Sequence, residues 1–167
     1  MKKALFIGRF QPLHKGHCHT IKEILEQESI GHLYIVISSA DKKGTDDNPF
    51  HFEARKKMLE KMFSKNIDDG KISVLGLEDY ESDEEWISRL KSIAPDFNIA
   101  FTRNDWTRRC LESDCIVEKQ EFYDEKHFNG TYIRSRINEE KDISNLVSEE
   151  VLEIIDNKIL QKNYIIS

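Results

Sequence analysis

The sequence predicts an α/β fold, a Rossmann-like doubly wound parallel sheet in a three-layer α/β/α sandwich. Short β-branched apolar runs alternate with amphipathic segments of helical periodicity, which is the pattern of successive strand–helix units. The run Leu33–Ile37 is apolar without interruption, as expected for a strand buried on both faces. The 167 residues contain no repeat and no Pro- or Gly-rich linker. We therefore expect a single domain over 1–167, with a C-terminal helical segment from about residue 131.

The N-terminal elements follow from apolar periodicity. The first expected strand is the short apolar run Ala4–Ile7. Apolar residues at helical spacing predict a helix over 15–28, and Gly31 is expected to end it. The strand Leu33–Ile37 comes next. A helix over 52–63 then carries Ala54, Met58, Leu59 and Met62 on one side.

The later elements repeat the alternation. Ser82 with Glu85 three residues on has the pattern of a capping box and predicts the start of a helix. The other expected elements are strands over 72–75, 97–101 and 115–117 and helices over 107–111 and 147–160. Because sheets of this kind bind ligands at the carboxyl ends of their strands, the loops after residues 7, 37, 77 and 101 are the candidate site.

Composition excludes several classes of protein. The chain has 25 basic and 31 acidic residues, a net charge of −6, which argues against a nucleic-acid partner but leaves room for a local basic pocket. No apolar run approaches the roughly 20 residues that cross a bilayer, and the four apolar residues after Lys3 are too few for a signal-peptide core. Cys18, Cys110 and Cys115 form no CxxC pair. They predict neither a disulfide framework nor a zinc site, and they suit a reducing cytoplasm. With no apolar run of that length, no membrane partner is expected.

The loop after the first strand has its own chemistry. It reads Gly8-Arg9-Phe10-Gln11-Pro12-Leu13-His14-Lys15-Gly16-His17, which is neither a GxGxxG turn nor a Walker A loop. Gly8 allows the backbone to approach a ligand, and one helical turn places His14 and His17 on the same side. Gly16 leaves room between them, and Lys15 with the helix N-terminus adds positive potential for a phosphate. The alternative is that the two histidines only cap a helix.

A second basic segment lies near the C-terminus. It reads Asn129-Gly130-Thr131-Tyr132-Ile133-Arg134-Ser135-Arg136. Asn-Gly predicts a turn and Thr131 an N-cap, so that the following backbone N–H groups and Arg134 face an anion. Arg136 is roughly 200° further around a helix, so one face cannot carry both arginines. The alternative is an ordinary capped helix with solvated arginines.

Three further candidate binding residues lie in the sequence between the two segments described above. Arg55 could serve a substrate phosphate or a structural ion pair. Trp86 offers a stacking face for a flat cationic ring, or it belongs to the core on an apolar stripe with Leu90. Asp79 offers an acceptor for a ring amide or a ribose hydroxyl. The remaining acidic residues around it predict a solvated face.

The loop at 8–17 closely resembles the first signature of the nucleotidyltransferase α/β-phosphodiesterase superfamily, the HxGH family. GRFQPxHxGH is similar to the string of the archaeal-type nicotinamide mononucleotide (NMN) adenylyltransferases. The segment 129–136 resembles the superfamily's second signature, and 48–55 resembles the NPFxxxxR segment of the same subgroup. Asp79 and Trp86 match D-x(6)-W, which is associated with the nicotinamide pocket. Asn104 matches an Asn near the adenine and ribose.

The resemblance runs from Phe6 to about Ile155 and implies a nucleotidyltransferase (HUP-like) fold and a reaction. The 5′-phosphate of NMN attacks the α-phosphorus of ATP, pyrophosphate leaves, and NAD+ forms without a covalent enzyme intermediate. His14, His17 and Arg134 are the implied catalytic residues, with His17 on the α-phosphoryl oxygen. The implied ATP- or phosphate-binding residues are Gly8, Arg9, Phe10, Lys15, Gly16, Asn104, Gly130, Thr131 and Arg136. Asp79, Trp86 and Arg55 are assigned to NMN.

The resemblance also implies Mg²⁺ with ATP, held mainly by phosphate oxygens and water rather than by protein ligands, and a homo-oligomer. The chain departs from the family at Arg103, where relatives keep a small residue, and at Asp46 and Asp47, where they often carry a basic one. Asp83 stands where a relative can carry Asn. Two alternatives stay open. One is transfer to another acceptor, such as phosphopantetheine, FMN or a polar alcohol phosphate, and the other is a nucleotide sensor without turnover.

Overall fold

The computed structural model describes residues 1–119, 123–124 and 126–164. Its centre is a five-stranded sheet in the order β3-β2-β1-β4-β5 in which every pair of neighbours is parallel. The strands are β1 (Lys2–Gly8), β2 (Ile30–Ile37), β3 (Ile72–Gly76), β4 (Ile99–Thr102) and β5 (Ile116–Lys119). The chain runs outward from β1 to β3 and then crosses back to β4. The strand order therefore reverses between β1 and β4, and the predicted Rossmann-like fold is confirmed.

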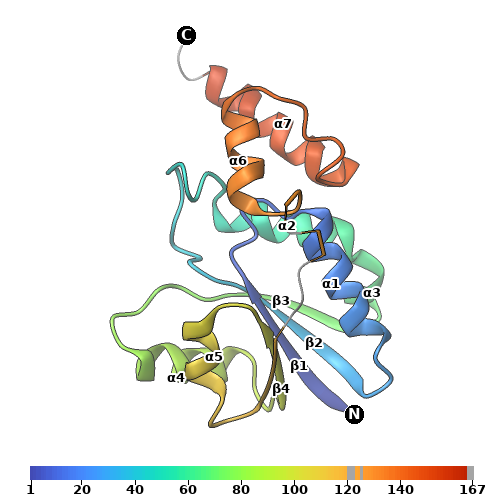
Figure 1. Ribbon diagram of the computed structural model, residues 1–167, viewed down its shortest axis with the longest axis vertical. Helices are drawn as coiled ribbons and strands as arrows, with labels where there is room; N and C mark the ends of the chain where they lie inside the picture. Colours follow the sequence, from blue (N-terminus) through green and yellow to red (C-terminus); the bar gives the residue numbers. More distant parts are fainter. Residues whose placement is uncertain (120–122, 125, 165–167) are drawn as a thin grey trace.

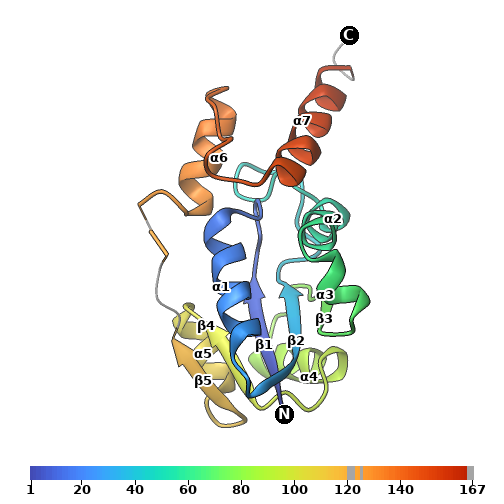
Figure 2. The same cartoon turned by 90° about the vertical axis from the view of Figure 1, so that its right-hand side faces the viewer.

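Helices cover both faces of the sheet (Figure 1). They are α1 (Lys15–Glu26), α2 (Phe52–Met62), α3 (Ser64–Asp68), α4 (Asp83–Ile93), α5 (Asp105–Leu111), α6 (Gly130–Asn138) and α7 (Glu149–Tyr164). Helices α1, α2 and α3 lie on one side of the sheet and α4 and α5 on the other, which Figure 2 shows edge-on. Helices α6 and α7 lie beyond the carboxyl ends of the strands.

The interior strand β2 shows how the sequence builds this sandwich. Leu33, Ile35 and Ile37 pack into the core that contains α1 and α2, whereas Tyr34 and Val36 pack into the core that contains α4 and α5. All five are at most 8% exposed. Because each fully buried aliphatic side chain contributes roughly 1.5–3 kcal/mol, both faces of the strand stabilise the fold. The expectation from its uninterrupted apolar run is confirmed.

The end of α1 and the presence of α3 differ from the sequence prediction. Helix α1 ends at Glu26, and Gly31 lies inside β2 rather than ending the helix. A tight turn after Gln27, in which Ile30 donates its N–H to the Gln27 carbonyl at 2.9 Å, reverses the chain before Gly31 is reached. Helix α3 was not predicted, because its five residues carry no buried side chain and so no apolar stripe.

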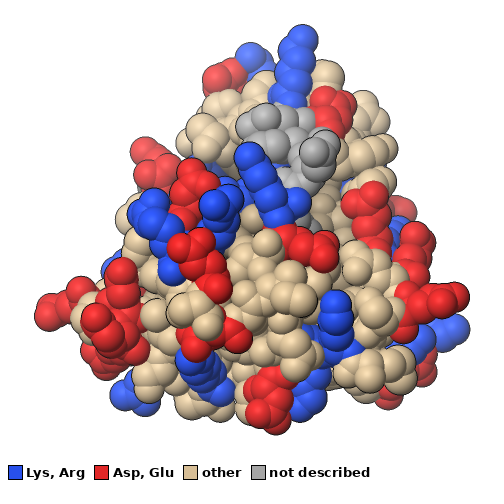
Figure 3. Space-filling view, turned by 60° about the horizontal axis from the view of Figure 1, so that its bottom comes forward, with Lys and Arg blue, Asp and Glu red and all other residues tan. Residues whose placement is uncertain are grey.

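Figure 3 shows Lys and Arg interspersed with Asp and Glu over one face of the molecule, with no continuous basic surface on that face. In the part of the chain that the structure describes, no helix combines the length and apolar character needed to cross a membrane.

Candidate active site

A cavity of about 540 Å³ lies at the reversal of strand order, at the carboxyl ends of β1 and β4. The loops after β1, β2, β3 and β4 all contribute to its wall, together with the first turns of α1, α5 and α6. Most of the candidate residues line it: Gly8, Arg9, Phe10, His14, Gly16, His17, Asp79, Trp86, Asn104, Gly130 and Arg134. The other candidates, Lys15, Arg55, Thr131 and Arg136, lie outside it.

His14 and His17 cap α1 reciprocally. The His14 Nδ1 accepts a hydrogen bond from the backbone N–H of His17 at 3.2 Å, and the His17 Nδ1 accepts one from the backbone N–H of His14 at 3.4 Å. This is a capping box made of two imidazoles. The rings stack with their centroids 3.6 Å apart and their planes at 19°.

These contacts fix the chemistry of both rings. A ring nitrogen that accepts a hydrogen bond carries no proton, so each neutral ring holds its proton on Nε2 and can donate it. Burial, with a smaller effect of the Arg103 charge, lowers the pKa of His14 to about 3. Burial, together with His14 and Arg103, also lowers the pKa of His17 well below its usual value. Both histidines are therefore neutral Nε2–H donors at neutral pH.

Two glycines allow the helices to approach the loop this closely. A Cβ on Gly16 would lie 2.8 Å from the Cβ of Phe128 and 3.1 Å from the His14 Nδ1. A Cβ on Gly130 would lie 2.9 Å from the Arg134 Nη1 and 3.3 Å from the Gln11 carbonyl oxygen. Since contacts below about 3 Å force a neighbour to move, a Cβ at Gly16 or Gly130 would displace Phe128 or the Arg134 guanidinium from this arrangement.

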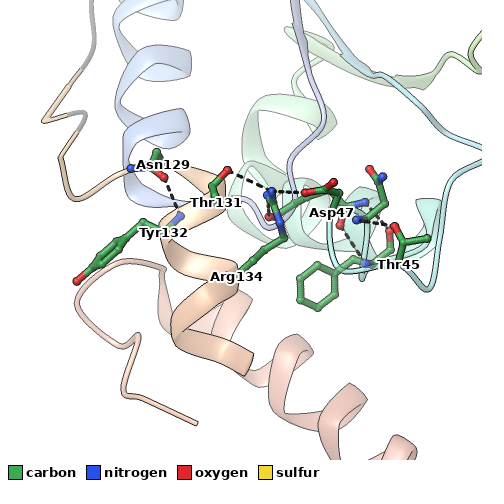
Figure 4. Close-up of polar contacts among 9 residues, drawn as sticks. Thr45, Asp47, Asn129, Thr131, Tyr132 and Arg134 are labelled. Carbon is green, nitrogen blue, oxygen red and sulfur yellow. Dashed lines mark hydrogen bonds and ion pairs between the residues drawn. The ribbon is translucent and has the colours of Figure 1, made fainter. Parts of the chain in front are cut away.

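Arg134 reaches the cavity from α6 and is only 6% exposed. Its Nη1 donates to the Gln11 carbonyl at 3.1 Å, and its Nη2 lies 3.3 Å from both the Asp47 carboxylate and the Thr131 hydroxyl (Figure 4). Burial lowers the pKa of Arg134, and the nearby Arg9 lowers it further. Arg134 and Arg9 thus form a cationic part of the cavity wall.

The N-cap of α6 is Asn129, not Thr131 as the sequence predicted. The Asn129 Oδ1 accepts a hydrogen bond from the backbone N–H of Tyr132 at 2.7 Å. Both residue types are good N-caps, and here the Thr131 hydroxyl is engaged by Arg134.

Arg136 and Lys15 do not reach the cavity, contrary to their predicted phosphate-binding role. The Arg136 Nε and Nη2 donate to the Asp142 carbonyl at 2.9 and 2.7 Å, which holds the connection between α6 and α7. The Lys15 Nζ donates to the Ser144 carbonyl at 3.4 Å. The expectation that one helix face cannot carry both Arg134 and Arg136 is confirmed.

Arg55 has neither of the two roles that the sequence left open. It is fully buried, and it donates to the carbonyls of Arg9, Ser38 and Ser39 at 2.9–3.0 Å and of Ala40 at 3.5 Å. Burial lowers its pKa to about 10, so it stays protonated at neutral pH. Arg55 therefore ties the loop after β1 to the loop after β2, and its assignment to NMN is corrected to a positioning role.

Aromatic and acidic side chains form another part of the cavity wall. Trp86 lines the cavity although it is only 4% exposed, and it meets Trp106 edge-to-face at 4.9 Å and 67°. The Asp79 carboxylate accepts a hydrogen bond from the Ser39 hydroxyl at 3.0 Å. Trp106 was missed by sequence reasoning. The helix was expected from residue 107, whereas α5 starts at Asp105.

The Asn104 side chain caps α5 by accepting from the Thr107 N–H at 3.0 Å. Arg103 also lines the cavity, so its bulk does not close it. Other lining residues that were not singled out are Gln11, Thr20, Ser38, Tyr80, Tyr123 and Phe128. Among the described residues, no group of three or more His, Cys, Asp or Glu side chains is placed to hold a metal ion.

The parallel sheet, the paired histidines at the first helix and the arginine on α6 are typical of Rossmann-like α/β nucleotidyltransferases. The chain belongs to the cytidylyltransferase-like family, whose sequence model matches residues 5–155. It is 33% identical to a nicotinamide-nucleotide adenylyltransferase of Methanococcus aeolicus, over 92% of this chain and 88% of that protein. It is 31% identical to the protein of the same name from Archaeoglobus fulgidus, over 92% and 90%. The resemblance to the archaeal-type enzymes is confirmed.

Solved structures show the same fold. A bifunctional NMN adenylyltransferase/ADP ribose pyrophosphatase from Francisella tularensis superposes with a TM-score of 0.75 at 23% identity, over 99% of this chain. This chain spans about half (54%) of that longer protein. A second structure of the Francisella protein, with a TM-score of 0.73, contains AMP and a manganese ion. At this identity the likeness concerns the fold alone.

Proposed function

We propose that the protein transfers AMP from ATP to NMN, giving NAD+ and pyrophosphate, as the names of its archaeal relatives indicate for those proteins. The observation that carries the proposal is the cavity itself. Two neutral imidazole donors and the cations Arg9 and Arg134 line it together with Asp79 and two tryptophans. A phosphate-bearing, ring-bearing acceptor matches that combination of groups.

The phosphate chemistry rests on positioning and charge stabilisation. A phosphate oxygen of NMN attacks the α-phosphorus of ATP, and the bond from the α-phosphorus to the bridging oxygen breaks as pyrophosphate leaves with the electron pair. Negative charge on the phosphoryl oxygens meets the Nε2–H donors of His14 and His17 and the guanidinium of Arg134. No proton transfer is needed, which fits histidines that stay neutral.

The cysteines are also consistent with direct attack of NMN on the α-phosphorus, without a covalent enzyme intermediate. A covalent route needs an activated nucleophile, and the thiol that follows His17 is Cys18. Burial raises the pKa of Cys18 to about 12, so at neutral pH it is a thiol rather than a nucleophilic thiolate. Cys115 is similar, because burial raises its pKa to about 11.

Mg²⁺ belongs to this proposal as part of the Mg–ATP substrate. The described residues offer no cluster of ligands to hold it, and Mg²⁺ retains water and binds phosphate oxygens readily. The ion would neutralise charge on the triphosphate. The residues of this chain would orient the triphosphate through Arg9, Arg134 and the histidine pair.

The proposal is tested by pyrophosphate release from ATP and Mg²⁺ with a panel of acceptors: NMN, nicotinic acid mononucleotide, phosphopantetheine and FMN. We expect release with the pyridine mononucleotides and formation of the matching dinucleotide. Release only with phosphopantetheine or FMN would assign a different acceptor. ATP binding without release would favour the nucleotide sensor.

We also propose a cytoplasmic homo-oligomer. The free cysteines Cys18, Cys110 and Cys115 suit a reducing compartment. Light scattering would show an oligomer as a mass that is a multiple of 19.6 kDa, and a mass of 19.6 kDa would contradict it.

A further inference from the structure

The loop after β1 contains a buried side-chain amide. Gln11 is 2% exposed, and its side chain forms two hydrogen bonds with the backbone of Phe50, which lies just before α2. The Gln11 Nε2 donates to the Phe50 carbonyl at 2.8 Å, and the Gln11 Oε1 accepts from the Phe50 N–H at 2.9 Å. Because the amide is engaged through both its nitrogen and its oxygen, it holds the two segments in a fixed relation to each other.

The backbone of the same residue contacts the arginine of α6. The Gln11 carbonyl accepts a hydrogen bond from the Arg134 Nη1 at 3.1 Å, and this hydrogen bond is buried. The first turn of α6 packs closely on that carbonyl, since a Cβ on Gly130 would lie 3.3 Å from its oxygen. Gln11 therefore joins α6 to the segment before α2, through its main chain on one side and its side chain on the other.

A second contact between the same elements fixes the direction of the Gln11 carbonyl. Arg55, on α2, donates to the carbonyl of Arg9 at 3.0 Å, two residues before Gln11. Gln11 in turn reaches back to Phe50. Since both contacts connect the loop after β1 to α2 or to its first residues, the backbone between Arg9 and Gln11 has little freedom to rotate.

The two terminal nitrogens of Arg134 have partners of different kinds. The Nη1 is held by the buried Gln11 carbonyl. The Nη2 lies 3.3 Å from both the Thr131 hydroxyl and the Asp47 carboxylate (Figure 4), and the Asp47 side chain is 78% exposed. An incoming triphosphate can displace an exposed carboxylate far more readily than a buried carbonyl. The guanidinium thus has one fixed nitrogen and one exchangeable nitrogen.

We propose that Gln11 is a positioning residue that holds the Nη1 of Arg134, so that its Nη2 is presented to the triphosphate of ATP. This inference rests on the proposed function, in which Arg134 binds phosphate. A planar guanidinium donates to phosphate at fixed angles, so a rotated plane loses hydrogen bonds although the charge remains. Gln11 itself is not a ligand in this proposal, because its amide is directed at Phe50.

The test removes the amide of Gln11 and asks whether the effect passes through Arg134. Gln11→Met has a similar volume and lacks both polar atoms, and it is made alone and together with Arg134→Met. The matched control is Asn98→Leu, which also loses two amide–backbone hydrogen bonds, one from the Lys3 N–H at 2.9 Å and one to the Asp96 carbonyl at 3.2 Å. Asn98 lies just before β4 and outside the cavity wall.

For each full-length protein, pyrophosphate release gives kcat and the KM values for Mg–ATP and NMN, and calorimetry gives Kd for Mg–ATP without turnover. Circular dichroism and the KM for NMN show whether Gln11→Met is folded. If it is not, Gln11→Glu takes its place, because its carboxylate keeps an acceptor for the Phe50 N–H and lacks the donor.

We expect Gln11→Met to raise KM and Kd for ATP about tenfold, as for the loss of one charge-assisted hydrogen bond, and to leave KM for NMN within about twofold. Asn98→Leu should leave all three within about twofold. Arg134→Met should raise Kd for ATP roughly 30-fold. The double variant should match Arg134→Met within about twofold, because a residue that acts through Arg134 has no effect once that side chain is gone.

A tenfold effect of Gln11→Met that persists in the Arg134→Met background would show a general structural role and overturn the inference. An effect of Gln11→Met no larger than that of Asn98→Leu would overturn it as well, and in both cases the proposed function stands. ATP binding that depends on Gln11 as expected, without pyrophosphate release with any acceptor, would overturn the proposed function and support the inference. A wild-type protein that does not bind ATP would overturn both.

Discussion

Substitution of His14 can separate helix capping from catalysis, because the two roles use different ring nitrogens. The Nδ1 caps α1 by accepting from the His17 N–H at 3.2 Å, and the Nε2–H is the proposed donor to phosphate. His14→Asn keeps a side-chain oxygen that can cap the helix but removes the Nε2–H. His14→Ala removes both.

The expected effects differ in kind. Loss of one transition-state donor should lower kcat about 10²-fold in both variants. Loss of the cap should cost about 1 kcal/mol in His14→Ala alone. For a chain of this size that is a difference of about 2–4 °C in Tm between the variants. Both variants lose the ring stacking on His17 at 3.6 Å, so their difference isolates the cap.

Pyrophosphate-release kinetics at saturating Mg–ATP and thermal denaturation by circular dichroism give the two readouts. Equal Tm values for the Asn and Ala variants would refute the capping role of the side chain. A kcat within about threefold of wild type in His14→Asn would refute the donor role of Nε2–H. A fall in KM for ATP together with kcat would instead indicate lost ground-state strain.

Further substitutions and pH test the remaining groups. His17→Ala should lower kcat about 10²-fold or more, measured in the same assay; an unchanged kcat would contradict its role. Arg55→Met leaves three loop carbonyls without their close donor, which should cost about 3 kcal/mol and lower Tm by roughly 6–12 °C. Asp47→Asn removes an exposed competitor of the triphosphate for Arg134 and should lower KM for ATP about two- to fivefold at low salt, with less effect at high salt. The folded-state pKa of His14, about 3, lies below its usual 6.5. As pH is lowered, His14 in the unfolded chain therefore takes up its proton at a higher pH than in the folded protein. The free energy of unfolding should then fall as pH drops from about 6.5 towards 3, measured by urea denaturation, and kcat should show no histidine titration between about pH 6 and 8.

Local patterns in the sequence were sufficient to predict the sheet and the loop that carries the histidines. Strand β2 and helix α1 are encoded by apolar residues close together in sequence, and the order of elements then predicted a site in the loops after residues 7, 37, 77 and 101, which all line the cavity. The partners of Arg55 could not be predicted. They are backbone carbonyls 15 to 46 residues away, and a carbonyl has no sequence signature. Trp106 was missed because α5 is only seven residues long, and its start was placed two residues late.

The sequence left two uses for several residues, and the structure shows that the uses are not exclusive. His14 and His17 both cap α1 and line the cavity, because imidazole carries two nitrogens with separate partners. Trp86 is buried in the core and also forms part of the wall. For His14 and His17, the capping hydrogen bonds determine the chemistry of the rings. Because each Nδ1 accepts a hydrogen bond, the proton lies on Nε2, and burial keeps the ring neutral. A histidine that did not cap the helix could point either nitrogen at a phosphate. Capping therefore holds each ring in one tautomer and burial keeps it neutral, and a fixed donor to a developing phosphoryl charge requires both.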